Sequence, residues 1–158
     1  RHRHRFSADR RFSEMKRLSV FLVFAMSALV AQAQTEDARE LVKMSPAAEA
    51  NLRSEMRGNL RALNDILALL AEGKLAEVAA AAEKELGVSA MGKHRTQPMD
   101  ARPGPQMPPA MHGIGMAGHK AASEFARIAA TGDLNKTMAA LPSLTSGCVA
   151  CHYSYRIR

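Results

Sequence analysis

Apolar residues recur at steps of three and four along four stretches of the chain, and this spacing predicts four amphipathic α-helices. The first helix is predicted over residues 46–72, because Ser45 and Pro46 place a serine cap before a proline at the first helical position. Gly73 is expected to end it. Its expected apolar face consists of Leu52, Met56, Leu60, Leu63, Leu67 and Leu70. A second helix is predicted over residues 74–86, with Leu75, Val78, Ala79, Ala82 and Leu86 on one face and Gly87 as its stop.

Two further helices are predicted in the C-terminal half. The third covers residues 110–131, with a stripe of Met111, Ile114, Gly118, Ala121, Phe125 and Ile128. Its glycines, Gly113, Gly115 and Gly118, allow close approach of another helix or of a flat cofactor. The last helix follows Asp133 as N-cap, and Pro142 predicts either a kink or a break with a new helix near Ser143. One side of this helix is expected to hold Leu134, Met138, Leu141, Cys148, Cys151 and Tyr155.

The remaining segments connect these helices. Residues 87–109 contain five prolines, which exclude a regular helix, so this connection is expected to cross along the bundle or to form a flexible surface loop. Residues 34–44 are expected to be a short lead-in with weak helical character. The chain is rich in Ala, Leu, Met and Glu and only 4% aromatic, which favours helices over sheets. The sequence therefore predicts an all-α four-helix bundle over residues 34–158.

Residues 15–33 have the pattern of a secretory signal peptide. Lys16 and Arg17 precede an apolar run over residues 18–30, and Ala31-Gln32-Ala33 matches an A-x-A cleavage site. Cleavage is expected after Ala33, which predicts a periplasmic protein. The apolar run is short for a membrane span, so no span is expected in the mature form. Residues 1–14, rich in Arg and His, are interpreted as a non-native or disordered extension before a start at Met15.

The predicted cleavage changes the meaning of the charge. The full chain carries a net charge of +7, but seven of its basic residues and two of its acidic residues precede position 34. The mature part is left with 15 basic and 13 acidic residues, a net charge of +2. The basic character therefore does not indicate a nucleic-acid partner, and it is too small to choose the charge of any other partner.

The strongest chemical signal is Cys148-Val149-Ala150-Cys151-His152. C-x-x-C-H is the attachment signal for a c-type haem, in which both thiols form thioethers with the porphyrin and the histidine ligates the iron. A thioredoxin-like redox motif would need a βαβ pattern, and a structural zinc site would need four ligands; neither is visible. A regulatory disulfide is the remaining alternative. The motif and the export signal together predict one covalent haem c near the C-terminal helix.

The C-terminal position of this motif, with Tyr155 and Arg156 after it, resembles the class II cytochromes c, namely cytochrome c-prime and its low-spin, methionine-ligated relatives. The helical layout agrees from about Ser45 to Arg156, whereas the Pro-rich stretch 97–109 and Pro142 depart from the family pattern. The resemblance implies thioethers from Cys148 and Cys151, His152 as axial ligand, and Arg156 near that imidazole. It also implies a deciding residue on the first helix, which is a methionine in low-spin members and a bulky apolar residue over an open site in high-spin members.

Met56 is the candidate for the sixth iron position. It lies on the apolar stripe of the first helix, in the stretch Arg53-Ser54-Glu55-Met56-Arg57-Gly58-Asn59, which resembles the low-spin members. A thioether sulfur is a normal ligand of haem iron, but methionine also fills bundle interiors, so core packing is the alternative for Met56. Met44, outside the first helix, is a weaker alternative ligand.

Three histidines and several methionines have competing interpretations. His112 and His119 share a face of the third helix away from its apolar stripe, which favours rim positions. His119 becomes a rival sixth ligand if that helix is rotated, and His94 is expected at the surface. Five methionines around the Pro-rich connection raise a weak copper-binding hypothesis, since thioethers suit Cu(I); they are Met91, Met99, Met107, Met111 and Met116.

Two functions follow from these patterns. The first is a periplasmic electron carrier with one haem c, held by His152 and Met56, that exchanges one electron with redox partner proteins. The second is a five-coordinate haem protein that binds NO or CO in the manner of cytochrome c-prime. No nucleophile, base and orienting group occur in a catalytic pattern, so an enzyme is not expected. Some relatives dimerise through their first helices, which leaves a homodimer possible.

Overall fold

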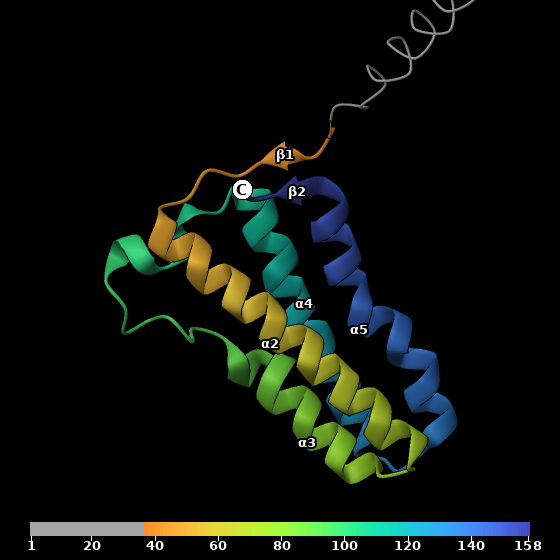
Figure 1. The fold of residues 1–158 in the computed structure, drawn as a ribbon. Helices are drawn as coiled ribbons and strands as arrows, with labels where there is room; N and C mark the ends of the chain where they lie inside the picture. The colour runs from red at the N-terminus through yellow and green to blue at the C-terminus, as the bar shows by residue number, and fades with distance from the viewer. Residues whose placement is uncertain (1–36) are drawn as a thin grey trace, which may run out of the picture. The chain divides into compact units, whose positions relative to one another are not determined.

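The computed structural model describes residues 37–158, so the predicted N-terminal extension, the signal peptide and its cleavage after Ala33 lie outside the described residues. Four α-helices account for most of the described chain, and the all-α class and the helix count are confirmed (Figure 1). The elements in chain order are β1 (Glu40–Leu41), α2 (Pro46–Ala71), α3 (Leu75–Leu86), α4 (Pro109–Ala129), α5 (Leu134–Ser154) and β2 (Tyr155–Arg156).

The helix ends follow the local signals in the sequence. The Ser45 hydroxyl accepts a hydrogen bond of 3.1 Å from a backbone N–H in the first turn of α2, and Asp133 accepts one of 3.0 Å at the start of α5. Gly73 and Gly132, which follow α2 and α4, have φ values of 70° and 76°. Other residues rarely adopt this left-handed conformation, so these two glycines let the chain reverse directly after each helix.

The last helix continues through Pro142. Helix α5 is one helix from Leu134 to Ser154, so the predicted break near Ser143 is wrong. Pro142 is exposed, and its ring therefore points away from the packed side of the helix. The consequence for function is that Leu144 in the core and Cys151 near the C-terminus belong to one continuous helix.

The long connection between α3 and α4 is anchored to the start of α2. It contains three 3-10 turns: Val88–Ala90, Met99–Ala101 and Gly104–Gln106. The Ser45 backbone N–H donates to the Gln106 side-chain carbonyl at 2.8 Å, and the Asn51 amide donates to the Ala101 carbonyl at 2.8 Å. Of the two expected arrangements, the structure therefore supports a crossover along the bundle.

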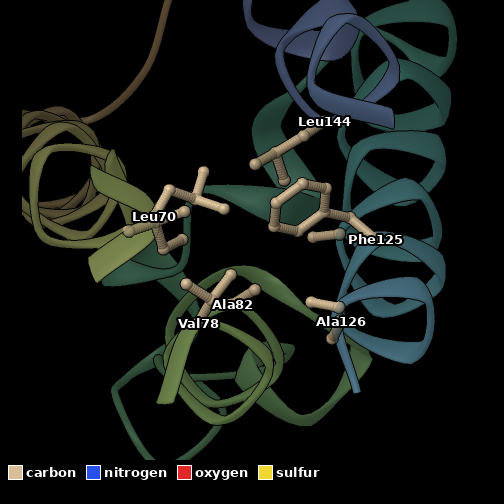
Figure 2. Close-up of a cluster of buried hydrophobic side chains, with 9 residues drawn as sticks. Leu70, Val78, Ala82, Phe125, Ala126 and Leu144 are labelled. Carbon is tan, nitrogen blue, oxygen red and sulfur yellow. The ribbon is translucent and has the colours of Figure 1, made fainter. Parts of the chain in front are cut away.

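A main core joins all four helices (Figure 2). Phe125 of α4 is 1% exposed and projects from its helix toward Leu70 of α2 and Leu144 of α5. Val78 and Ala82 of α3 close the core from a third direction. The buried members are Ile66, Leu70, Val78, Ala82, Ala122, Phe125, Ala126, Ala129 and Leu144.

The apolar faces of α2 and α5 were predicted only in part. Leu60 and Leu67 of α2 are 69% and 48% exposed, whereas Ile66 is fully buried. Helix α2 packs mainly against α3, and the row that it buries there runs through Ala62, Ile66 and Leu70. These three residues are four apart and therefore lie on one side of the helix.

In the first turns of α5 a polar residue is buried where apolar residues were expected. Leu134 and Met138 are 44% and 49% exposed, and Thr137 is fully buried instead. The Thr137 hydroxyl donates to the Asp133 backbone carbonyl at 2.7 Å. This internal partner lowers the cost of taking the hydroxyl out of water.

The segment before α2 is extended and not helical. Residues Glu40–Leu41 form β1, which pairs in parallel with β2 at the end of the chain (Figure 1). Glu40 is opposite Tyr155, and Leu41 is opposite Arg156. For the described part of this lead-in, residues 37–44, the expected weak helical character is therefore wrong. The hydrogen bonds come from a partner 113 to 115 positions away, which no local sequence pattern predicts.

Candidate functional site

The end of α5 presents the C-x-x-C-H residues on one side of a helix. Cys148 and Cys151 are three apart and Cys148 and His152 four apart, so the three side chains lie on neighbouring turns of one face. Both cysteines are free thiols. Cys148 and His152 are exposed, whereas Cys151 is half-buried. The motif therefore lies at the boundary between the packed side of α5 and solvent.

Cys151 faces a second apolar cluster that is separate from the main core. We call it the sulfur-rich cluster, because five of its nine members carry sulfur. Its buried members are Val42, Leu52 and Met111, and its half-buried members are Met44, Met56, Met107, Cys151, Tyr155 and Ile157. The cluster brings together the lead-in, α2, the end of the Pro-rich connection, α4 and the C-terminal end of the chain.

Met56 belongs to this cluster together with Cys151. It lies on α2, on the third turn of that helix, and is half-buried. The structure thus brings the sequence-predicted sixth ligand and one predicted attachment cysteine into one group of side chains from different helices. Met44, the weaker alternative, is a half-buried member of the same cluster.

The pKa of Cys151 is raised above its ordinary value. Burial of the thiol is the main cause, because a thiolate in apolar surroundings loses the solvation that stabilises its charge. The neighbouring Cys148 adds a smaller effect in the same direction. At neutral pH, Cys151 is therefore a protonated thiol, which suits a position next to apolar side chains.

The side of α5 next to the motif exposes apolar and aromatic surface. Val149 is 60% exposed and Tyr153 is 84% exposed. Val149 directly follows the exposed Cys148, and Tyr153 directly follows the exposed His152. This end of the helix therefore offers reactive and apolar groups side by side at the surface of the described chain.

One helical turn before Cys151, α5 is in close contact with α4. A Cβ atom built on Gly147 would lie 3.2 Å from the Gly118 Cα. Of the two uses expected for the glycines of the third helix, Gly118 therefore serves the approach of another helix. No room for a flat cofactor exists between the two helices at this level.

Arg156 lies in β2, next to the motif. Its backbone carbonyl accepts a hydrogen bond of 2.8 Å from the Val42 N–H, and its side chain is half-buried. The His152 carbonyl accepts a hydrogen bond of 3.4 Å from the Arg39 guanidinium. The lead-in segment therefore contacts the chain on both sides of Tyr153 and Ser154.

Two of the other histidines, both on α4, have surroundings of their own. His119 is half-buried, and its Nδ1 lies 2.8 Å from the Leu86 carbonyl at the end of α3. His112 is exposed, and it lies close to Gly104. The His119 ring is therefore held at the end of α3, whereas Met56 packs in the same cluster as Cys151.

His94 was expected at the surface, but it is half-buried. Its side chain is 22% exposed, and its Nε2 lies 3.4 Å from a carboxylate oxygen of Glu55, whose side chain is 18% exposed. The connection folds back over α2, and this brings the two side chains together. The methionines of the connection also separate, since Met107 and Met111 join the sulfur-rich cluster while Met99 is 64% exposed.

Two parts of the site were not predicted from the sequence: the strand pair and the packing of Met107. The strand pair has two residues on each side, which is too short for a recognisable alternation of apolar and polar positions. Met107 was placed in the connection and named only in the copper-binding hypothesis; its packing in one cluster with Met56 depends on how that connection crosses α2. The apolar run Leu41-Val42 was the available signal, but it predicts burial without naming a partner.

Within residues 37–158, no helix is long and apolar enough to cross a membrane. The same range holds no group of three or more His, Cys, Asp or Glu side chains arranged to bind a metal ion; thioether sulfurs are not part of that count. The chain matches no model of a known protein family, no curated protein and no solved structure.

Proposed function

We propose that this protein is an exported c-type cytochrome of the class II kind, with one covalent haem c, that transfers single electrons. The observation that carries the proposal is the shared position of Met56 and Cys151 in the sulfur-rich cluster. A thioether from α2 and the histidine of a C-x-x-C-H motif together form a donor set for a six-coordinate haem c iron.

The residues present fit this group in three respects. Cys148 and His152 are exposed and therefore free to react and to ligate, and Cys151 is a free thiol beside them. The cluster around Cys151 is apolar, which suits a porphyrin face. Although α4 contacts α5 closely at Gly147, one turn before Cys151, the exposed Cys148 and His152 remain accessible to the group.

In this function Cys148 and Cys151 would hold the haem through thioethers, and His152 and Met56 would ligate its iron. The bound haem supplies a one-electron couple at its iron. The apolar side chains around Cys151 would exclude water from one side of the group. Methionine in the sixth position would raise the reduction potential and block the site that small gases need.

The test is the visible absorption spectrum of the protein, produced together with a c-type haem maturation system. Ferric and dithionite-reduced spectra are recorded with and without CO. Sharp reduced bands that CO leaves unchanged support the electron carrier with Met56 as ligand. A high-spin spectrum that shifts with CO would instead favour the five-coordinate NO- or CO-binding function. Absence of a Soret band would overturn haem binding, and a Cys148–Cys151 disulfide would then be sought.

Met56→Ala is expected to convert the low-spin protein into a high-spin, CO-binding form with a lower reduction potential, because the thioether ligand is removed. Covalent haem, measured as pyridine haemochrome, should stay at the wild-type level, since its attachment residues are all on α5. Met44→Ala is the matched control, as it removes a half-buried methionine of the same cluster. If Met44→Ala gives the high-spin, CO-binding form and Met56→Ala does not, Met44 and not Met56 is the ligand.

A further inference from the structure

The residues of the proposed haem site are divided between two helices that have other main partners. Cys148, Cys151 and His152 lie on α5, which packs mainly against α4. Met56 lies on α2, which packs mainly against α3. Whether a sulfur on α2 reaches an iron held by α5 therefore depends on what joins these two helices at the motif end.

At that end, backbone hydrogen bonds between β1 and β2 connect the segments next to these two helices. Strand β1 ends at Leu41, a few residues before α2 begins at Pro46, and β2 follows α5 without a gap. Pairing of β1 with β2 therefore ties the start of α2 to the end of α5. Farther along the bundle, Leu70 and Leu144 of the main core join the same two helices.

The contacts of the strand pair are few and specific. The Val42 N–H donates to the Arg156 carbonyl at 2.8 Å, and the Arg39 guanidinium donates to the His152 carbonyl at 3.4 Å. The Val42 side chain is 5% exposed and packs in the sulfur-rich cluster with Met56 and Cys151. The same residue thus makes the strand hydrogen bond and the packing contact.

We propose that residues 39–42 form a strap that holds Met56 in position to ligate a haem iron bound at His152, with Val42 as its central positioning residue. The inference rests on the proposed function, and it adds that coordination of the iron depends on the N-terminal segment. The strap is not needed to retain haem, because both thioethers and the proximal histidine belong to α5. Opening the strap therefore releases Met56 while the haem stays attached.

The test is Val42→Pro in the full chain, since proline has no N–H to donate to Arg156. The variant is expected to keep wild-type pyridine haemochrome and far-UV circular dichroism. Its CO-reactive fraction should rise roughly three- to tenfold, the factor for the loss of one hydrogen bond. Lys43→Pro is the matched control, because it places a proline at an exposed position of the same segment and keeps the Val42 N–H. Val42→Ile should behave as the wild type.

Hydrogen exchange gives a readout that does not depend on the haem spectrum. The amide of Val42 should be protected in the wild type, and the amide of Arg156 should exchange faster in Val42→Pro. If the strap exchanges freely in the variant while CO binding stays at the wild-type level, the proposal is overturned. Should Val42→Pro lose its helical signal, Leu41→Gly, which weakens the strand without proline, decides by the same two measurements.

The wild-type spectrum separates failure of the strap from failure of the proposed function. A wild type without haem overturns both. A wild type with haem that already binds CO overturns the strap and leaves haem binding intact. A low-spin wild type whose Val42→Pro and Leu41→Gly variants both remain inert to CO overturns the strap alone.

Discussion

At the scale of single residues, the two cysteines of one motif have different surroundings. Cys148 is exposed, while Cys151 is half-buried and packs in the sulfur-rich cluster. Burial raises the pKa of the Cys151 thiol, so less of it is thiolate at neutral pH than for an ordinary cysteine. Since the thiolate is the reactive form, the two positions should differ in chemical reactivity.

In the haem-free folded chain, iodoacetamide is therefore expected to alkylate Cys148 before Cys151. The rate at Cys151 should rise as the pH increases through and above the ordinary thiol range, because the raised pKa shifts thiolate formation upward. Peptide mass spectrometry at several pH values measures both rates. In urea the two rates should converge; equal rates in the folded chain would contradict the burial of Cys151.

At the scale of elements, glycine positions in the helices have opposite surroundings. A side chain on Gly147 of α5 would meet Gly118 of α4 at 3.2 Å. A side chain on Gly58 of α2 would meet nothing within 4 Å, and Gly58 is exposed. The same substitution should therefore change stability in opposite directions at the two sites.

Gly58→Ala is expected to raise the free energy of unfolding by about 0.5–1 kcal/mol, because alanine restricts the unfolded chain and favours helix. Gly147→Ala is expected to lower it by about 1–2 kcal/mol, since the overpacking that pushes α5 from α4 outweighs the same gain in helix propensity. Urea unfolding followed by circular dichroism measures both. A stabilising Gly147→Ala would show that α4 and α5 separate easily.

Helix existence and helix ends could be predicted, because their signals are local. Ser45 and Asp133 cap the helices that they were expected to cap, and Gly73 and Gly132 follow helix ends. The buried faces of the helices were harder to predict, because the neighbouring helix decides which side is buried. Leu60 was expected on the apolar face of α2 and is exposed, whereas Ile66 is buried. The C-x-x-C-H motif could be found from spacing alone. The packing of Cys151 in one cluster with Met107 and the pairing of β1 with β2 could not, because both depend on chain segments far away in sequence.

At the scale of the whole described chain, the residues of the main core and the residues around the proposed haem site form two different clusters. The main core holds Phe125, Ile66 and Val78, each at most 1% exposed, and contains no sulfur among its buried members. The sulfur-rich cluster contains three buried residues, and its other members are half-buried. Changes in the main core should therefore act on folding, and changes around Cys151 on the proposed haem site.

Phe125→Ala is expected to lower the free energy of unfolding by about 3–5 kcal/mol, the range for removing a buried phenylalanine. A small domain has about 5–15 kcal/mol in total, so the variant should be close to unfolding at 37 °C. Leu60→Ala, at a 69% exposed position, is the control and should change stability by about 0.5 kcal/mol or less. Chemical denaturation measures both, and a comparable loss in the control would contradict the assignment of the buried face of α2.

The parallel pairing of β1 with β2 also sets an order of events in folding. Arg39 and His152 are 113 positions apart, so their contact closes a loop that spans nearly all of the described chain. Closing so long a loop costs more entropy than forming any helix hairpin, and contacts of this kind form late. We expect the motif end to remain open after the main core has assembled. A nascent chain would thus offer its two thiols to an external enzyme during an interval that ends when the first and last segments meet.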